Sequence, residues 1–392
     1  MKALILAAGR GTRVQPLTRS IPKPMLPVLN KPVMESLIEL LREHGVTEIV
    51  INTSYLSNEI ESYFRDGARF GVEIAYSFEG SLREGRLYDE PLGSAGAIRR
   101  IQDHSGFFDE PFFVLCGDAL IDLDLSLMAA RHHERRAIAS IALAEVDRQE
   151  VSSYGVVVTD GDGWIRDFQE KPKVEEARSN LVNTGIYLFE PEVVKWIPRT
   201  FPYDLGSQLF PALVAANERF LGIQIPFEWL DIGKTTDYYK VVQMALRGSV
   251  PRLPPHGREI APGVRVGANV RLDLTETTVI PPVMIGGSCR IEPGARIEGP
   301  TLIDAGSVVE KGAEVIRSLA FPYTRVGPYA HLKEAIACGS YCVAADGSVL
   351  DIPEADLGWV LSDARAPLAD LPEHVRELVE LMGAVGKARG QG

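Results

Sequence analysis

Cysteine is scarce in this sequence: its 392 residues include four cysteines, at positions 116, 289, 338 and 342, and no Cys-x-x-Cys pair. This scarcity argues against a disulfide scaffold and against a zinc site of the common kind, and it favours a reducing compartment. Long apolar runs are also missing, because stretches such as Phe112–Cys116 fall far short of the roughly 20 residues that cross a bilayer. The first apolar run is broken by Gly9 and Arg10, which favours a strand and loop over a signal peptide. We therefore expect a cytoplasmic protein without membrane contact.

An excess of basic residues is lacking as well. Forty-one Lys and Arg stand against 53 Asp and Glu, so the formal net charge is −12. This balance disfavours broad nucleic-acid binding but allows a local basic pocket for phosphates. Apolar residues at 45% and charged residues at 24% are ordinary globular values, and the length predicts two or three domains.

Strands and helices alternate in the first part of the chain, which predicts an α/β domain over residues 1–246. Buried strands ended by glycine or polar residues alternate with helices, a pattern typical of an α/β fold with a Rossmann-like, doubly wound mixed sheet and helices on both faces. The expected strands are Ala3–Ala7, Glu48–Asn52, Pro111–Cys116, Val156–Thr159 and Gly185–Phe189, and the expected helices include Met34–His44 and Asp237–Leu246.

A different pattern follows a proline-rich linker over residues 247–257. Apolar residues recur every six positions at Ile285, Ile291, Ile297, Ile303, Val309 and Val315, with small or turn residues between them. Neither a helix nor a flat sheet has a six-residue period, whereas a parallel β-helix does. We expect such a domain over residues 258–350. Hexads at Val266 and Val326 are out of phase, which suggests loops inserted between coils, and a helical tail is expected over 351–392, with a helix at Pro372–Met382.

The strongest chemical motif is the glycine-rich loop after the first strand. Gly9-x-Gly11-Thr12-Arg13 offers consecutive backbone N–H groups to phosphate oxygens, and Arg13 and Lys23 add positive charge. Pro22 and Pro24 flank Lys23 and predict an extended backbone there. The loop lacks the GK[ST] of Walker A, and Val14 occupies the third glycine position of the Rossmann fingerprint.

Further motifs indicate a nucleotide and a sugar phosphate. Leu92–Ala97 is a second glycine-rich loop entering a helix, and Gly117-Asp118 ends a buried strand, where doubly wound sheets place ligands. Asp118 and Asp231, with a polyphosphate, are the usual ligand set of Mg²⁺. An acid and a base, Glu170 and Lys171, suit a hydroxyl and a phosphate, and Gly155 and Asn183 suit a sugar.

The order of these motifs resembles that of the sugar-1-phosphate nucleotidyltransferases, also called NDP-sugar pyrophosphorylases. The motifs are GxGTRxxPLT…PKPM, LGSAG, CGD, SSYGVV, EKP, NTGIY and WLDIG, and they cover residues 1 to about 246. Many members also carry a left-handed β-helix, which extends the resemblance to about residue 345. The whole chain is similar to a cyanobacterial-type group of UDP-glucose pyrophosphorylases and mannose-1-phosphate guanylyltransferase-like proteins. The resemblance implies Mg²⁺-dependent conversion of NTP and hexose-1-phosphate to NDP-hexose and pyrophosphate.

The resemblance also implies a role for each motif residue. Arg13 and Lys23 would stabilise the leaving pyrophosphate, Asp118 and Asp231 would hold Mg²⁺, and Lys171 would bind the sugar phosphate. The sugar-phosphate site would comprise Gly155, Glu170, Lys171 and Asn183. The nucleotide site would comprise Leu6, Ala8, Gly9, Gly11, Thr12, Arg13, Gly93, Ser94 and Gly117.

Base and sugar are not settled by these motifs. Guanine presents two donors that one carboxylate can accept, and residues 76–92 hold Glu79, Glu84, Asp89 and Glu90 but no Gln or Asn. Backbone groups can read uracil without an amide side chain. The resemblance to the cyanobacterial group favours UTP with glucose-1-phosphate, and GTP with mannose-1-phosphate is the alternative.

Two other classes remain open. A non-catalytic subunit that binds an NDP-sugar would tend to lose a basic or acidic motif residue, and all are present here. An acyltransferase in the β-helix would need a histidine with a partner, and His331 has no evident one. The β-helix is expected to be a scaffold for a homo-oligomer. The His132-His133 pair is expected on a solvated helix face and not at a metal site.

Overall fold

The computed structural model describes residues 1–250 and 252–366, which form two compact units. The first unit comprises Met1–Thr12, Thr18–Leu26 and Lys31–Asp231. The second comprises Arg13–Leu17, Pro27–Asn30 and the chain from Ile232 onward. The expected helix at Pro372–Met382 lies outside the described residues.

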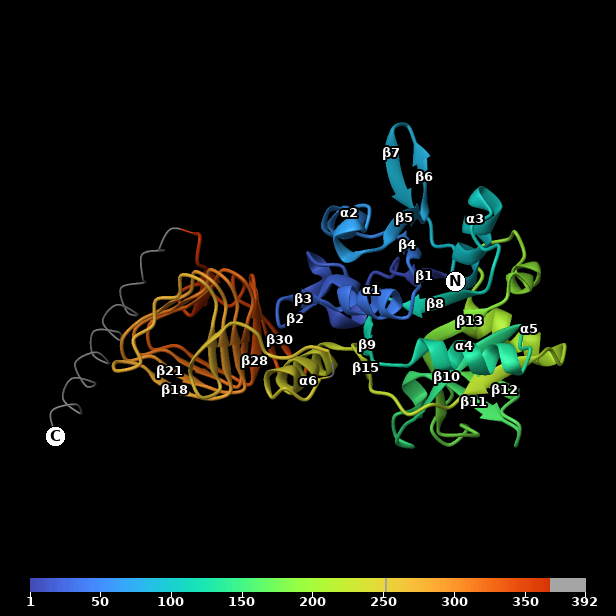
Figure 1. Ribbon diagram of the computed structural model, residues 1–392. Helices are drawn as coiled ribbons and strands as arrows, with labels where there is room; N and C mark the ends of the chain where they lie inside the picture. Colours follow the sequence, from blue (N-terminus) through green and yellow to red (C-terminus); the bar gives the residue numbers. More distant parts are fainter. Residues whose placement is uncertain (251, 367–392) are drawn as a thin grey trace. The chain divides into compact units, whose positions relative to one another are not determined.

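The first unit is built on a nine-stranded mixed sheet (Figure 1). Four strands, in the order β8-β1-β4-β5, run parallel to one another. Strand β13 pairs antiparallel with both β8 and β10, and β14 lies parallel to β10. The strands are β1 (Lys2–Leu6), β4 (Glu48–Thr53), β5 (Glu73–Phe78), β8 (Phe112–Cys116), β10 (Ala139–Glu145), β11 (Gly155–Thr159), β12 (Ile165–Glu170), β13 (Leu181–Phe189) and β14 (Phe220–Ile223).

Both faces of this sheet are buried, which explains the continuous apolar runs of its strands. Ile5 packs in one core with residues of helices α1, α2 and α4, and its neighbour Leu4 packs in a second core with residues of α3 and α5. The doubly wound α/β fold is thus confirmed. The helices are α1 (Val33–Glu43), α2 (Ser57–Phe64), α3 (Ser94–Ser105), α4 (Leu125–Glu134) and α5 (Phe210–Ala215).

Shorter elements complete this part of the chain. A hairpin of β6 (Gly80–Arg83) and β7 (Arg86–Asp89) projects from the first unit in Figure 1. Strand β15 (Trp229–Asp231) pairs antiparallel with β9 (Ala119–Ile121). Brief 3₁₀ turns are η1 (Thr12–Val14), η2 (Leu17–Arg19) and η3 (Lys23–Met25), and the strands β2 (Pro27–Val28) and β3 (Lys31–Pro32) are equally short.

The second unit contains helix α6 (Thr235–Leu246) and the predicted parallel β-helix. Three sheets form its walls, and strands on successive coils pair in parallel, as Val283 with Thr301 and Arg296 with Glu314. The first sheet holds β16 (Arg258–Ala261), β17 (Val264–Val266), β19 (Val283–Ile285), β22 (Thr301–Ile303), β25 (Leu319–Ala320), β28 (Ala335–Cys338), β29 (Tyr341–Ala344) and β30 (Val349–Asp351). The second holds β18 (Thr278–Ile280), β21 (Arg296–Glu298), β24 (Glu314–Ile316) and β27 (His331–Lys333), and the third β20 (Arg290–Ile291), β23 (Val308–Val309), β26 (Thr324–Val326) and β31 (Leu361–Asp363).

The six-residue period places one apolar residue on each wall per coil. Ile285, Ile291 and Ile297 are all at most 5% exposed, and each stacks on the residue eighteen positions later. The out-of-phase hexads arise from changes of one residue in coil length and not from the predicted inserted loops. Val266 pairs with Ile285, nineteen residues on, and Val309 with Val326, seventeen residues on, so single residues are added or lost between coils.

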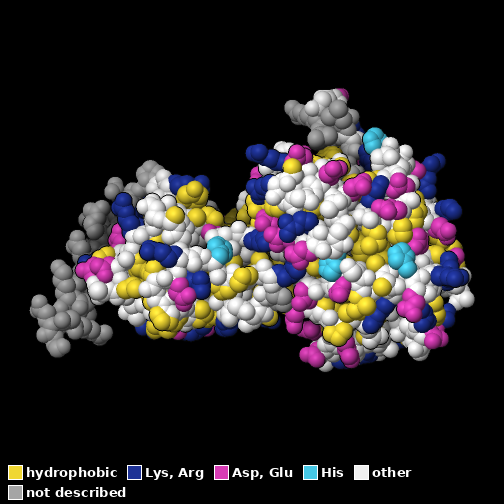
Figure 2. All heavy atoms as spheres, viewed as in Figure 1, with side chains coloured by type: hydrophobic (Ala, Val, Ile, Leu, Met, Phe, Trp, Pro, Cys, Tyr) yellow, Lys and Arg dark blue, Asp and Glu magenta, His cyan; other side chains and the backbone are white. Residues whose placement is uncertain are grey.

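Among the described residues, no helix is both long and apolar enough to cross a bilayer. On the face shown in Figure 2, basic and acidic side chains are interspersed over both units.

Candidate active site

A cavity of about 470 Å³ opens where the loops after β1 and β8 meet. In the strand order the chain continues from β1 towards β4 and from β8 towards the opposite edge, where β13 and β10 lie, and doubly wound sheets bind ligands where the strand order reverses in this way. The Gly117 N–H donates to the Leu6 carbonyl at 3.0 Å and ties the two strand ends together. Of the predicted site residues, those that line the cavity are Leu6, Ala8, Gly9, Lys23, Gly93, Ser94 and Asp118.

Lys23 and Asp118 form a close ion pair in this cavity. Lys23 Nζ lies 2.5 Å from Asp118 Oδ2, and Lys23 is only 8% exposed. The predicted extended backbone at Lys23 is wrong, because Lys23 begins the 3₁₀ turn η3 after an extended Pro22. This turn packs the side chain on the glycine loop, where a Cβ on Gly11 would lie 3.0 Å from Lys23 Cβ. Gly11 also has φ +61°, so the loop needs glycine for both conformation and space.

Asp231 approaches the same end of β8 from another direction. The β9–β15 pairing sets Asp231 opposite Ala119, the residue after Asp118. Burial raises the pKa of the Cys116 thiol, and the negative charges of Asp118 and Asp231 raise it further. Both carboxylates therefore lie close enough to one thiol to act on it. Their oxygens form a donor set of the kind that a hard divalent cation prefers.

The second glycine loop begins helix α3 at the cavity wall. Gly93 has φ +78°, and a Cβ there would lie 2.4 Å from the Tyr203 carbonyl oxygen, so only glycine fits. That oxygen accepts hydrogen bonds from the N–H groups of Ala95 and Gly96. Ser94 Oγ donates to Asp204 Oδ2 at 2.6 Å. Tyr203 and Asp204 are therefore both hydrogen-bonded to the start of helix α3.

Asp204 is a site residue that the sequence analysis missed. It caps the helical turn η7 (Leu205–Leu209) by accepting from the N–H groups of Gly206 and Ser207. Burial raises its pKa, but the hydrogen bonds from Ser94 and from these N–H groups outweigh burial and hold the pKa below 3.8. The Asp-Leu-Gly-Ser sequence is a recognisable helix cap, but its contact with Ser94, 110 residues away in the chain, has no local signal.

The residues predicted for the sugar phosphate lie together beside Asp204, outside the cavity lining. Lys171 Nζ lies 3.1 Å from Glu170 Oε1. Glu170 Oε2 sits 2.6 Å from where a Cβ on Gly206 would be and 3.2 Å from one on Gly155. Both glycines therefore leave room for the carboxylate.

Asn183 belongs to the neighbouring strand β13. Its Nδ2 donates to Tyr187 Oη at 3.0 Å, and its Oδ1 accepts from the Gly185 N–H. Burial raises the pKa of Tyr187, and the negative charges of Asp204 and Glu170 raise it further, which places Asn183's partner near the acids of the sugar-phosphate group.

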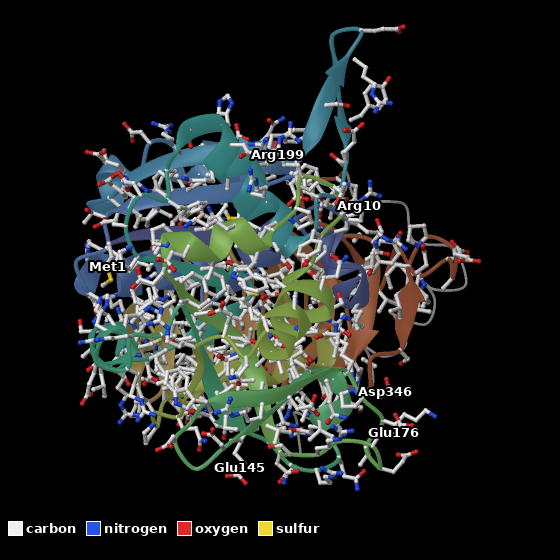
Figure 3. All side chains as sticks on the ribbon, turned by 90° about the vertical axis from the view of Figure 1, so that its right-hand side faces the viewer. Met1, Arg10, Glu145, Glu176, Arg199 and Asp346 are labelled. Atoms are coloured by element: carbon white, nitrogen blue, oxygen red, sulfur yellow. The ribbon has the colours of Figure 1, made fainter. Side chains whose placement is uncertain are left out.

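Three of the four acids considered as guanine readers contact other protein groups. Glu79 is buried, its Oε1 accepts from Asn52 Nδ2 at 2.7 Å, and its Oε2 accepts from the Leu92 N–H. Asp89 pairs with Arg10 at 3.2 Å near the foot of the hairpin (Figure 3), and Glu90 pairs with Arg83. Asn52, at the end of β4, lines the cavity and was also missed, although it ends a predicted strand.

Four of the residues predicted for the nucleotide do not line the cavity, namely Gly11, Thr12, Arg13 and Gly117, and Asp231 and the four sugar-phosphate residues lie outside the lining as well. Arg13 belongs to the second unit. Their assigned roles stay predictions.

Known proteins with the same architecture are nucleotidyltransferases. A family model described as Nucleotidyl transferase matches residues 2–248. A UTP–glucose-1-phosphate uridylyltransferase of Synechocystis is 51% identical over 93% of this chain and 94% of its own. A probable mannose-1-phosphate guanylyltransferase 1 of rice is 34% identical over 86% of this chain and 91% of its own.

Solved structures agree with this grouping. A UDP-glucose pyrophosphorylase crystallised with UDP-glucose superposes with a TM-score of 0.54 at 26% identity, covering 63% of this chain and 98% of its own. The 63% of this chain that the structure covers is close to the share that the family model matches. With a cavity at the switch point and a family model over the whole α/β part, this chain belongs to the nucleotidyl transferase family.

Proposed function

We propose that this protein is a UTP–glucose-1-phosphate uridylyltransferase. A phosphate oxygen of glucose-1-phosphate attacks the α-phosphorus of UTP, the bond to the β-phosphate oxygen breaks, and UDP-glucose and pyrophosphate are formed. The observation that carries the proposal is the partly buried Lys23–Asp118 pair in the cavity at the switch point. The whole-chain similarity to the Synechocystis uridylyltransferase supports the choice of substrates.

The chemistry requires positioning and charge stabilisation, with no general base, because the attacking phosphate is already an anion. Lys23 and Arg13 stabilise the leaving pyrophosphate, and Lys171 holds the sugar phosphate. Glu170, Gly155 and Asn183 bind sugar hydroxyls. The nucleotide lies along Leu6, Ala8, Gly9, Gly11 and Thr12, with Gly93, Ser94 and Gly117 beside the base and ribose.

The acidic residues of the site fit Mg²⁺. Asp118 and Asp231 supply carboxylate oxygens, which Mg²⁺ prefers together with phosphate oxygens and water. When bound, the ion neutralises phosphate charge. Asp118 contacts Lys23 through Oδ2 at 2.5 Å, so a bound ion would share this carboxylate with the ammonium group or displace it.

The contacts of Glu79, Asp89 and Glu90 support uracil over guanine. A guanine reader needs a carboxylate that is free to accept two donors, whereas Glu79 already accepts hydrogen bonds on both oxygens. Asp89 and Glu90 are paired with arginines. Uracil, with one donor and acceptors, is read by backbone groups of the cavity wall such as those of Ala8 and Gly9.

The test is pyrophosphate release by the purified protein with Mg²⁺, crossing UTP, GTP, dTTP, ATP and CTP with glucose-, mannose- and N-acetylglucosamine-1-phosphate. The expected result is a dominant rate with UTP and glucose-1-phosphate. A dominant rate with GTP and mannose-1-phosphate would overturn the substrate assignment and agree with the similarity to the rice protein. Absence of any rate, with NDP-sugar binding retained, would indicate a regulatory subunit.

The β-helix is proposed as the surface through which copies of the chain associate. The other proposed partners are the small-molecule substrates, with no nucleic acid and no membrane. Four free cysteines support the proposed cytoplasmic location, since none of them forms a disulfide. Sedimentation of the full chain tests the association.

A further inference from the structure

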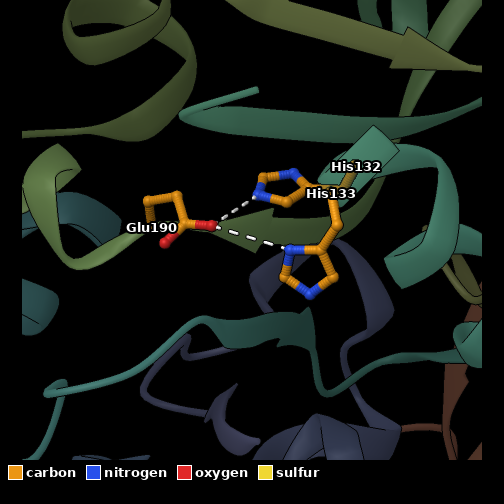
Figure 4. A group of neighbouring side chains, drawn as sticks. All are labelled: His132, His133 and Glu190. Carbon is orange, nitrogen blue, oxygen red and sulfur yellow. Dashed lines mark ion pairs between the residues drawn. The ribbon is translucent and has the colours of Figure 1, made fainter. Parts of the chain in front are cut away.

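Two histidines and a glutamate meet at one point of the first unit, away from the cavity (Figure 4). One ligand atom from each of His132, His133 and Glu190 lies within 4.8 Å of the others. The expectation that both histidines lie on a solvated face is wrong, because the His132 side chain is fully buried. His133 is half exposed.

The cluster and the cavity lie at opposite ends of the strands of the sheet. The histidines end helix α4, and Glu190 follows the last residue of β13. Phe189 pairs with Phe112, the first residue of β8, whereas the cavity lies beyond the last residue, Cys116. At about 3.3 Å per residue, β8 alone separates the two ends by roughly 13 Å. A ligand on the cluster therefore takes no direct part in the transfer reaction.

The hydrogen bonds of His132 leave one ring nitrogen without a partner. Nδ1 lies 2.7 Å from Ser140 Oγ. Nε2 is buried and makes no hydrogen bond, although it faces Glu190 Oε1 at 3.4 Å. If Nδ1–H donates to Ser140 Oγ, Nε2 carries a lone pair 3.4 Å from the Glu190 carboxylate oxygen. A buried nitrogen lone pair that faces an anion is costly unless a cation lies between them.

We propose that His132 Nε2, His133 Nδ1 and Glu190 bind a divalent zinc ion. Two imidazole nitrogens and one carboxylate oxygen form a set that suits Zn²⁺, with a fourth position for water. Ser140 acts as the outer partner that fixes the ring of His132, as such partners do at metal-binding histidines. Of the charged groups near the Glu190 carboxylate, Glu192 favours cation binding and Arg219 opposes it.

The position of the ligands predicts a structural role. A bound ion would join the end of α4 to the end of β13, two segments that meet at one edge of the sheet. Binding to the folded state alone raises stability in proportion to the logarithm of the metal concentration.

The experiment is a Zn²⁺ titration of the chelator-treated full chain by calorimetry, together with the thermal midpoint and the visible absorption of the Co²⁺ form. The variants are His133→Ala, at a half-exposed position, and Glu190→Gln, which preserves shape. His331→Ala is the matched control. Contrary to the sequence-based expectation, His331 has a carboxylate partner, Glu314 at 3.4 Å, so this control removes a His–Glu pair elsewhere.

The wild-type chain and His331→Ala should bind one Zn²⁺, gain thermal stability, and show a tetrahedral Co²⁺ spectrum. Each ligand variant should bind at least about 100-fold more weakly, since outer-shell changes alone cost 10–100-fold. Transfer activity with Mg²⁺ should stay within about twofold in His133→Ala, because the cluster lies outside the reaction. Absence of saturable binding to the wild-type chain, or unchanged binding in both ligand variants, would overturn the proposal.

Discussion

Replacing Lys23 by methionine separates its charge from its packing. The side chain packs against the glycine loop, where a Cβ on Gly11 would lie 3.0 Å from Lys23 Cβ and 3.5 Å from its Cγ. Methionine keeps this apolar stem and removes the ammonium group that lies 2.5 Å from Asp118. The variant therefore tests the electrostatic role of Lys23 with the loop intact.

Two magnitudes follow from the geometry. Breaking a fully buried ion pair costs about 3–5 kcal/mol and an exposed pair about 0–1 kcal/mol. Because the Asp118 side chain is 29% exposed and keeps contact with water, we expect destabilisation of about 1–3 kcal/mol, between these limits. In the reaction, losing one donor to the developing charge costs about 10²–10³ in kcat.

The assay is steady-state pyrophosphate release at saturating substrates, with thermal unfolding measured on the same samples. Asp118→Asn and the double variant complete a cycle. If Lys23 acts on the leaving pyrophosphate, the double variant should be slower than either single variant. Turnover of Lys23→Met within about threefold of wild type would refute its catalytic role. If the double variant has the same turnover as Asp118→Asn, Lys23 acts only by positioning Asp118.

Three other changes probe the fold and the site. Ile297→Ala, at a fully buried position of the β-helix, should lower the free energy of unfolding by about 2–5 kcal/mol in denaturant titrations, whereas Ile280→Ala, at a 38% exposed position, should change it by less than about 0.5 kcal/mol. Gly93→Ala should raise KM for UTP and lower stability, because its Cβ would lie 2.4 Å from the Tyr203 carbonyl. The folded pKa of Asp204 lies below 3.8, so its contribution is present above about pH 4 and is lost as the pH falls through the folded pKa. The stability difference between wild type and Asp204→Asn, followed by acid titration, should therefore shrink below that pH, and a constant difference would contradict the assignment.

The architecture could be predicted because it depends on periodicity. Alternating strands and helices produce the doubly wound sheet, and a six-residue period produces the β-helix, since each requires apolar residues at fixed spacing. The location of the cavity followed too, because glycine loops after β1 and β8 have to meet at the switch point.

The condition of individual side chains could not be predicted, because it depends on contacts between distant residues. The sequence allows Glu79 as a guanine reader, but its two carboxylate oxygens accept hydrogen bonds from Asn52 and from the Leu92 N–H. His132 sits in a strongly polar stretch, yet it is buried because helix α4 packs that side of its last turn beside β10 and β13. Short-range patterns report the average character of a segment and not the partner of one atom.

Strand β13 links the two proposed sites and argues for independence between them. Asn183 lies in the strand near the proposed sugar-phosphate group, and Glu190 follows the strand's other end. Between these ends the strand pairs with β8 on one side and with β10 on the other, with one irregularity in the β10 register between the pairs Leu143–Asn183 and Ile141–Tyr187. A strand so held is rigid, and its register cannot slip by one residue without moving every buried side chain to the opposite face. An ion at Glu190 can therefore secure one end of β13 without changing the position of Asn183, so zinc should affect unfolding and not the Michaelis constant for glucose-1-phosphate.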